Sequence, residues 1–218
     1  MAAITLSRRR RVNRLAGGVT FFLLGGMTAA ALALGRQPQP THAAPVTPVA
    51  AAAPAQRISV APSTLRQALA DGSIDRPIRT ILNVAHPMSY GDYVWNDAGV
   101  PGGRTWIRVD LKSQLLSVFR SGHEIGTAVI LYGGDGVPTP TGKFPVLAKF
   151  KDHRSATYDA PMPYTLRLTR DGVSIHASNV RWGYATHGCI GVPEGFAAKL
   201  FAAASVGDEV LVVDGRRA

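Results

Sequence analysis

From Arg104 onward, short hydrophobic segments alternate with turn residues, which is typical of β-strands joined by tight connections. Residues 106–111 and 115–119 flank the polar triplet 112–114 and predict a hairpin. A third strand is expected over 124–131. Further strands are predicted at 143–149, 164–169, 173–176 and 209–213.

Two segments instead show helical spacing. Thr64–Asp71 carries hydrophobic residues on one face, with Ser63 as the expected N-cap and Gly72 at the end. Glu194–Ala204 follows Pro193 and is amphipathic. The chain is therefore predicted to be mainly β, with few short helices.

The N-terminus has a different pattern. Arg8–Arg11 and Arg14 precede an uncharged, apolar run over 15–35. A basic flank followed by such a run indicates a signal peptide or an uncleaved membrane anchor within residues 1–36, and a buried core helix is the less fitting alternative. Because positive charge stays on the cytoplasmic side, the rest of the chain is expected to cross the membrane.

Residues 37–62 consist largely of Ala, Pro, Val, Thr and Gln, a composition that favours extended conformations. This segment is interpreted as a linker between the membrane signal and the folded part. Residues 63–103 form an N-terminal extension to which the sequence assigns no role.

The charge balance argues against a nucleic-acid partner. The 218 residues carry a formal net charge of +10, but six of the 24 basic residues lie before Ala43, where there is no acidic residue. The remaining 18 basic residues are set against 14 acidic ones, and no basic stripe remains to follow a phosphate backbone. The single cysteine excludes an intramolecular disulfide and a four-cysteine zinc site.

This single cysteine is also the candidate catalytic nucleophile. Cys189 lies in the segment Thr186–Pro193, and His176 ends a predicted strand upstream. An imidazole that takes the proton of a thiol makes it a nucleophile, and the neighbouring Gly188 leaves main-chain N–H groups free to approach an oxyanion. The alternatives are a buried structural cysteine with structural histidines, and a zinc site of His176, His187 and Cys189 that lacks a fourth ligand.

The order of motifs resembles the L,D-transpeptidase (YkuD-type) catalytic domain family. The resemblance rests on Ile175-His176 followed by Thr186-His187-Gly188-Cys189-Ile190, and on the segment Thr139-Pro140-Thr141-Gly142-Lys143-Phe144. It extends over residues 104–214, from a hairpin similar to the family's entry hairpin to a closing turn and strand. The family implies a β-sandwich, a peptidoglycan stem-peptide substrate outside the cytoplasm, and neither a metal nor a cofactor.

The resemblance also implies residue roles. Cys189 is expected to be the nucleophile and His176 its general base, with the Ala177 carbonyl orienting the imidazole. The amides of Gly188 and Cys189, together with the Tyr164 hydroxyl, are expected to bind the oxyanion. His187 is expected to shape the pocket floor and support the substrate.

One departure affects substrate binding. The family often has Arg or Asn two positions after the cysteine, where this chain has Gly191, so a group that could hold a substrate carboxylate is missing. Arg181, in the short loop between His176 and Cys189, is the candidate replacement. The expected activity is L,D-transpeptidation in the periplasm or cell envelope, with the N-terminal segment contacting the membrane if uncleaved. Hydrolysis of peptidoglycan links and non-catalytic wall binding are the alternatives.

Overall fold

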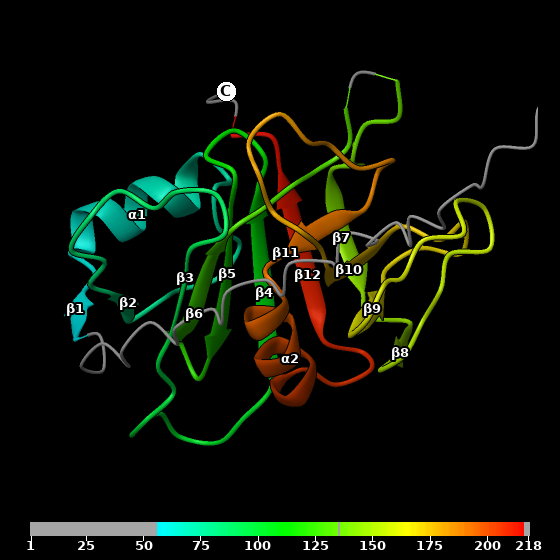
Figure 1. The fold of residues 1–218 in the computed structure, drawn as a ribbon. Coiled ribbons are helices and arrows are strands. Elements are labelled where there is room, and N and C mark those ends of the chain that lie inside the picture. Colours follow the sequence, from blue (N-terminus) through cyan, green and yellow to red (C-terminus); the bar gives the residue numbers. More distant parts are fainter. Residues whose placement is uncertain (1–55, 135, 216–218) are drawn as a thin grey trace, which may run out of the picture. The chain divides into compact units, whose positions relative to one another are not determined.

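The structure is a computed structural model that describes residues 56–134 and 136–215 (Figure 1). The predicted signal or anchor, and the predicted linker up to residue 55, lie outside the described residues. Within the described part, no helix has the length and apolar character needed to cross a membrane.

In the described residues the strands form two sheets, and the larger one has eight strands. Its order is β1–β2–β6–β5–β4–β12–β7, with β3 paired to β6. The central strand β4 pairs antiparallel with β5 and parallel with β12. The strands are β1 (Arg57–Ser59), β2 (Thr80–Leu82), β3 (Tyr93–Trp95), β4 (Thr105–Asp110), β5 (Leu115–Arg120), β6 (His123–Val129), β7 (Gly142–Pro145) and β12 (Glu209–Val213).

The smaller sheet has the order β11–β10–β9–β8. Its strands are β8 (Ala148–Phe150), β9 (Thr165–Arg167), β10 (Ser174–Ala177) and β11 (Ile190–Val192). Strands β10 and β11 are parallel, and residues 178–189 connect them. The two described helices are α1 (Pro62–Ala70) and α2 (Glu194–Ala203).

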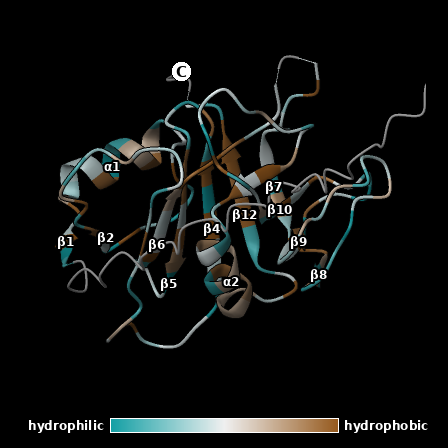
Figure 2. Cartoon of the chain, in the orientation of Figure 1, coloured by the Kyte–Doolittle hydropathy of each residue, from teal (hydrophilic) through white to brown (hydrophobic). Residues whose placement is uncertain are grey.

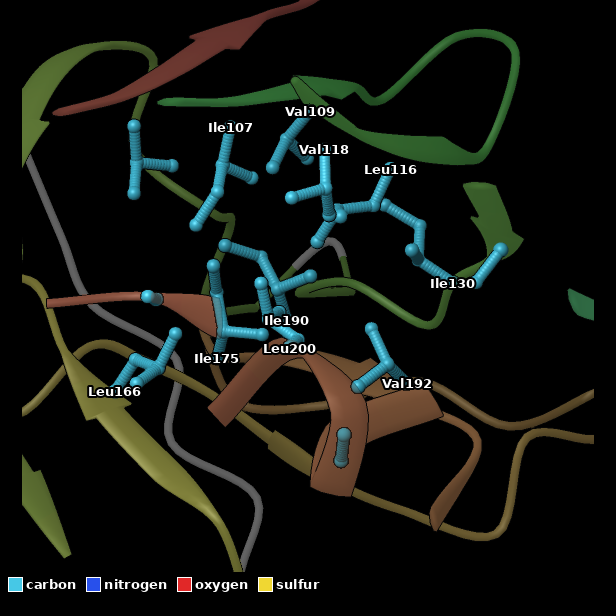
Figure 3. Close-up of a cluster of buried hydrophobic side chains, with 14 of the residues drawn as sticks. Ile107, Val109, Leu116, Val118, Ile130, Leu166, Ile175, Ile190, Val192 and Leu200 are labelled. Atoms are coloured by element: carbon cyan, nitrogen blue, oxygen red, sulfur yellow. The ribbon is translucent and has the colours of Figure 1, made fainter. Parts of the chain in front are cut away.

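One hydrophobic core joins the two sheets and α2. Hydrophobic positions gather on the central strands, whereas the connecting loops are largely hydrophilic (Figure 2). Figure 3 shows side chains of β4 and β5 facing those of β10, β11 and α2. Fully buried members include Ile107, Leu116, Ile175, Ile190 and Leu200. The mainly β fold with two short helices agrees with the sequence prediction.

Most predicted elements are confirmed to within a few residues, including the hairpin β4–β5, strand β12 and helix α2. The single strand predicted over 143–149 is wrong. The chain leaves the large sheet after β7 and enters the small one at β8, because the N–H of Val146 donates to Asp208 beside β12 whereas that of Leu147 donates to Arg167 of β9. The predicted N-cap is also wrong: α1 begins at Pro62, which follows Ala61 as N-cap and supplies a preset helical φ.

The N-terminal extension covers the outer face of the large sheet. Trp106 and Phe119, side by side on β4 and β5, stack at 4.4 Å and are buried with Ile74. Helix α1 adds Leu65 to this cluster. Residues 57–62, predicted as linker, instead form β1 and the start of α1, so the folded part begins earlier than expected.

Ion pairs fasten this extension to the sheet. Asp75 pairs with Arg76 at 2.7 Å and with Lys143 of β7 at 2.6 Å. Arg76 also pairs with Glu209 of β12 and lies 5.0 Å from the centre of the Trp106 ring. The hydrogen bond from Arg76 is the main cause that holds the pKa of Asp75 far below its ordinary value, although partial burial opposes it.

We expect Asp75→Asn to lower the free energy of unfolding by about 1 kcal/mol near neutral pH, because the pairs are partly solvated. A depressed pKa means that this contribution is present above the unfolded-state value of about 3.9 and fades as the pH falls towards the folded-state value. Chemical denaturation of both proteins across the acid range measures the difference. Asp97→Asn is the control, since within the described residues the half-exposed Asp97 forms one ion pair, with Arg120 at 3.5 Å. If the difference in the free energy of unfolding between the wild type and Asp75→Asn grows as the pH falls, the stabilising role assigned to the Asp75 ion pairs is contradicted.

Candidate active site

The register of β10 against β11 places the predicted catalytic residues on one face. Ile175 is level with Ile190, and both point into the core. Since side chains alternate along a strand, His176 and the residue before β11, Cys189, point to the opposite face. Cys189 comes one residue before Ile190, and Ser174 comes one residue before Ile175. In this parallel register Cys189 therefore lies opposite Ser174. The structure thus brings His176 and Cys189, thirteen positions apart in sequence, to one side of the small sheet.

The Cys189 thiol is half-buried and held by main-chain groups. Its Sγ lies 3.9 Å from the carbonyl oxygen of Gly172, within reach of a weak S–H donation. Burial raises the pKa of the Cys189 thiol, and a hydrogen bond from the main-chain N–H of Ser174 acts in the opposite direction. The net direction is upward, so the free thiol is protonated at neutral pH.

The His176 imidazole is buried and fixed in one tautomer. Its Nδ1 donates a hydrogen bond of 2.8 Å to the carbonyl oxygen of Ala177, as the family resemblance implies. Nε2 is therefore the nitrogen that can accept a proton. Burial is the main cause that lowers the pKa of His176, and the nearby His153 lowers it further, which keeps the ring neutral and able to act as a base.

A tight turn presents the cysteine. The Thr186 hydroxyl donates to the carbonyl oxygen of Cys189, and Gly188 between them has a φ of 89°, a conformation that favours glycine. Among the described residues, no main-chain carbonyl accepts the N–H of Gly188 or Cys189. Both amides are therefore free to bind an oxyanion.

The larger sheet holds this turn in place. The N–H of Thr186 donates to the carbonyl of Tyr132 at 2.9 Å, just beyond β6. The neighbouring Gly133 donates to the buried hydroxyl of Thr139 at 2.9 Å, and a Cβ on Gly133 would lie 2.2 Å from the carbonyl oxygen of Val137. Sequence reasoning missed this supporting role, although Thr139 opens the motif that carried the resemblance.

Cys189 and His176 line a cleft of about 1160 Å³. One wall is the 153–163 segment between β8 and β9. His187 also lines the cleft, is exposed, and stacks on Tyr158 of that wall with ring centres 4.3 Å apart. Tyr164 is not among the cleft-lining residues: its ring packs edge-on against Phe201 of α2 at 5.9 Å. The structure therefore brings His187 to the site, whereas Tyr164 is partly buried and packs against the core beside α2.

The position where the family often has Arg or Asn is closely packed in this chain. A Cβ on Gly191 would lie 2.8 Å from Cβ of Ser178 and 3.4 Å from Cβ of Leu131. Leu131 and Gly191 also exchange two main-chain hydrogen bonds of 2.9 Å. No side chain fits there without displacing Ser178.

The candidate replacement, Arg181, does not line the cleft. It is exposed, and its Nε donates to Asn179 in its own loop at 2.7 Å. Arg167 of β9 is the arginine among the lining residues. Within residues 56–134 and 136–215, no group of three or more His, Cys, Asp or Glu side chains is arranged to hold a metal ion.

Comparison with known proteins identifies the family of this chain. A model of the L,D-transpeptidase catalytic domain (YkuD) matches residues 104–212, half of the chain. The chain therefore belongs to this family of enzymes. A search of curated proteins returns no match.

Solved structures of L,D-transpeptidases are similar over part of their length. The enzyme from Stackebrandtia nassauensis is 25% identical with a TM-score of 0.49, over 53% of this chain and 58% of its own. The one from Mycobacterium smegmatis is 25% identical with a TM-score of 0.47, over 51% and 59%. A variant of the Enterococcus faecium enzyme is 29% identical with a TM-score of 0.47, over 50% of each chain. The match thus spans less than two thirds of those chains.

We expect Gly191→Ala to lower the free energy of unfolding by about 1–3 kcal/mol, because the new Cβ overlaps Ser178. In Gly191→Ala/Ser178→Gly the overlap is removed, so the two substitutions are expected to show a coupling of about 1 kcal/mol. Denaturant unfolding of the four proteins gives this cycle. Gly102→Ala, where a Cβ meets nothing within 4 Å, is the control. Strict additivity of the two substitutions contradicts the close approach.

Proposed function

We propose that this protein is a peptidoglycan L,D-transpeptidase that works through a Cys189 acyl-enzyme. The observation that carries the proposal is the placement of a half-buried thiol and a tautomer-fixed imidazole on one face of β10–β11, both lining one large cleft. Membership of the family supplies the substrate class, stem peptides of peptidoglycan. Residues 104–214 are the proposed catalytic domain.

In the acylation step, Nε2 of His176 takes the Sγ proton as the sulfur attacks the carbonyl carbon that links the third and fourth stem residues. The oxyanion of the tetrahedral intermediate binds the free amides of Gly188 and Cys189. Collapse breaks the C–N bond, and the imidazolium gives its proton to the departing amine of D-alanine. Cys189 is left as a thioester, and His176 is neutral again.

In the second step an amine of a neighbouring stem attacks the thioester carbon. His176 accepts a proton from that amine and returns it to the departing thiolate, so the free thiol is restored. The product is a 3→3 cross-link. Water in place of the amine would give hydrolysis, and product masses distinguish the two acceptors.

The electrostatics favour a neutral thiol–imidazole pair in the free protein. Burial raises the pKa of Cys189 and lowers the pKa of His176, so both directions oppose a resting thiolate–imidazolium pair. Proton transfer therefore accompanies attack on the carbonyl. His187, exposed and stacked on Tyr158, supports the substrate at the cleft wall and takes no part in this transfer.

Purified protein incubated with disaccharide tetrapeptide monomers is expected to give cross-linked dimers and a thioester on Cys189, seen by mass spectrometry. A carbapenem should form an adduct at the same residue. Cys189→Ala should lose the adduct, and His176→Ala should lower the acylation rate about 100-fold or more, since general-base catalysis contributes factors of this size. His187→Ala should slow turnover about 10-fold while adduct formation persists.

The variants also provide the controls. Circular dichroism checks the folding of each one. Trimmed monomers without dimers would assign hydrolysis instead, and a folded protein that forms neither adduct nor product would support non-catalytic wall binding. If His187→Ala loses the adduct and His176→Ala keeps it, the two histidine roles are reversed.

We also propose that the domain works in the periplasm or cell envelope. The arginine cluster and apolar run within residues 1–36 support this location, either as a cleaved signal or as an anchor in the inner membrane. A reporter that is active only outside the cytoplasm, fused after Ala218, is expected to be active. Deleting residues 1–36 should abolish that signal at equal expression, and activity of a strictly cytoplasmic reporter at the same site would contradict the location.

A further inference from the structure

Arg167 lies in line with the catalytic cysteine on the cleft face of the small sheet. Arg167 of β9 pairs with Ser174 of β10. On the other side of β10, the register with β11 places Cys189 opposite the same Ser174. Residues that are level in neighbouring strands point to the same face. Arg167, Ser174 and Cys189 therefore form one row across three adjacent backbone segments.

The position of Arg167 in this row determines how far its backbone lies from that of Cys189. Neighbouring strands lie about 4.8 Å apart, so the Arg167 Cα is roughly 10 Å from that of Cys189. Both side chains line the same cleft. The long arginine side chain can thus place its charge beside a substrate whose carbonyl lies at the thiol.

The guanidinium of Arg167 lies near an aromatic ring and has no hydrogen-bond acceptor among the described residues. It lies 5.9 Å from the centre of the Phe150 ring, which packs against His153 at 5.3 Å. Among the described residues, the guanidinium of Arg167 makes no ion pair and donates no hydrogen bond. It is half-buried, so its five N–H donors are held at the cleft without a protein acceptor.

We propose that Arg167 is the carboxylate-binding residue of the donor site, in the place of the charged side chain that Gly191 lacks. The ligand chemistry is a carboxylate held by two parallel N–H donors, the geometry for which a guanidinium is suited. This proposal rests on the proposed function. Two carboxylates of a tetrapeptide stem flank the bond that is cleaved, the terminal one on the leaving residue and a side-chain one on the third residue.

The charged groups around the site make this assignment selective. Two carboxylates, Asp171 and Glu194, also line the cleft, and neither forms an ion pair within the described residues. A substrate carboxylate is repelled by those positions and attracted by Arg167. Register and charge therefore orient the stem with its carboxylate towards β9.

The test combines protein variants with amidated donors. The wild type, Arg167→Gln and Arg167→Lys are each given three tetrapeptide stems: unmodified, amidated at the terminal carboxyl, and amidated at the side-chain carboxyl of the third residue. Thioester formation at Cys189 is followed by mass spectrometry. Arg181→Gln is the matched control, because its guanidinium lies outside the cleft.

For the unmodified donor we expect Arg167→Gln to raise the KM for acylation about 10- to 100-fold with little change in kcat, since a charge-assisted hydrogen bond is lost. Arg167→Lys should recover part of the loss. One of the two amidated donors should react equally poorly with the wild type and with Arg167→Gln. The carboxyl group that is amidated in that donor is the one that Arg167 binds. Arg181→Gln should behave as the wild type.

Other outcomes overturn the proposal. If the wild type accepts both amidated donors as readily as the unmodified one, no carboxylate is recognised. Equal losses for all three donors in Arg167→Gln would show a structural role, and a selective loss in Arg181→Gln would assign the recognition to that residue. Failure of every stem to acylate the wild type would instead count against the proposed function itself.

Discussion

The parallel pairing of β10 with β11 is the constraint on which the candidate site depends. Ile175 and Ile190 are buried at the same level, so a shift of one residue would turn a core side chain outward. The hydrophobic register therefore also aligns His176 and Cys189 on the other face. Packing of the core side chains thus sets the relative position of His176 and Cys189. The connecting loop over 178–189 is not required to set it.

The turn that presents Cys189 depends on the larger sheet. Main-chain hydrogen bonds join the residues after β6 to Thr186 and Gly191, and Thr139 secures the segment on its other side. The same close approach leaves no room for a side chain at Gly191. The segment that supports Cys189 thus has no space for a side chain at Gly191, and the arginine that lines the cleft, Arg167, comes from β9.

The extension over residues 57–95 has a structural explanation. It places β1, β2 and β3 on the large sheet and buries the stacked pair Trp106 and Phe119, which a bare sheet would expose to water. Its part around α1 lies on the outer face of that sheet, whereas the cysteine cleft is lined mainly by the small sheet and its loops, with Gly91 as the lining residue from the extension. The extension therefore contributes Gly91 to the cleft directly and otherwise acts through the stability of the sheet that supports the Thr186–Cys189 turn.

The sequence by itself determined the β-rich class, the hairpin of β4 and β5, and helix α2, and it singled out Cys189 and His176 as candidates, because strand alternation, helical spacing and a dense motif can be read from the sequence alone. Only the tertiary structure decided the rest. The division of 143–149 between two sheets, the packing of Tyr164 against Phe201 and the cleft position of Arg167 each depend on which distant segment packs alongside. Local patterns record whether a side chain is buried, but they do not record its neighbours, and those are set by how the two sheets pair and pack.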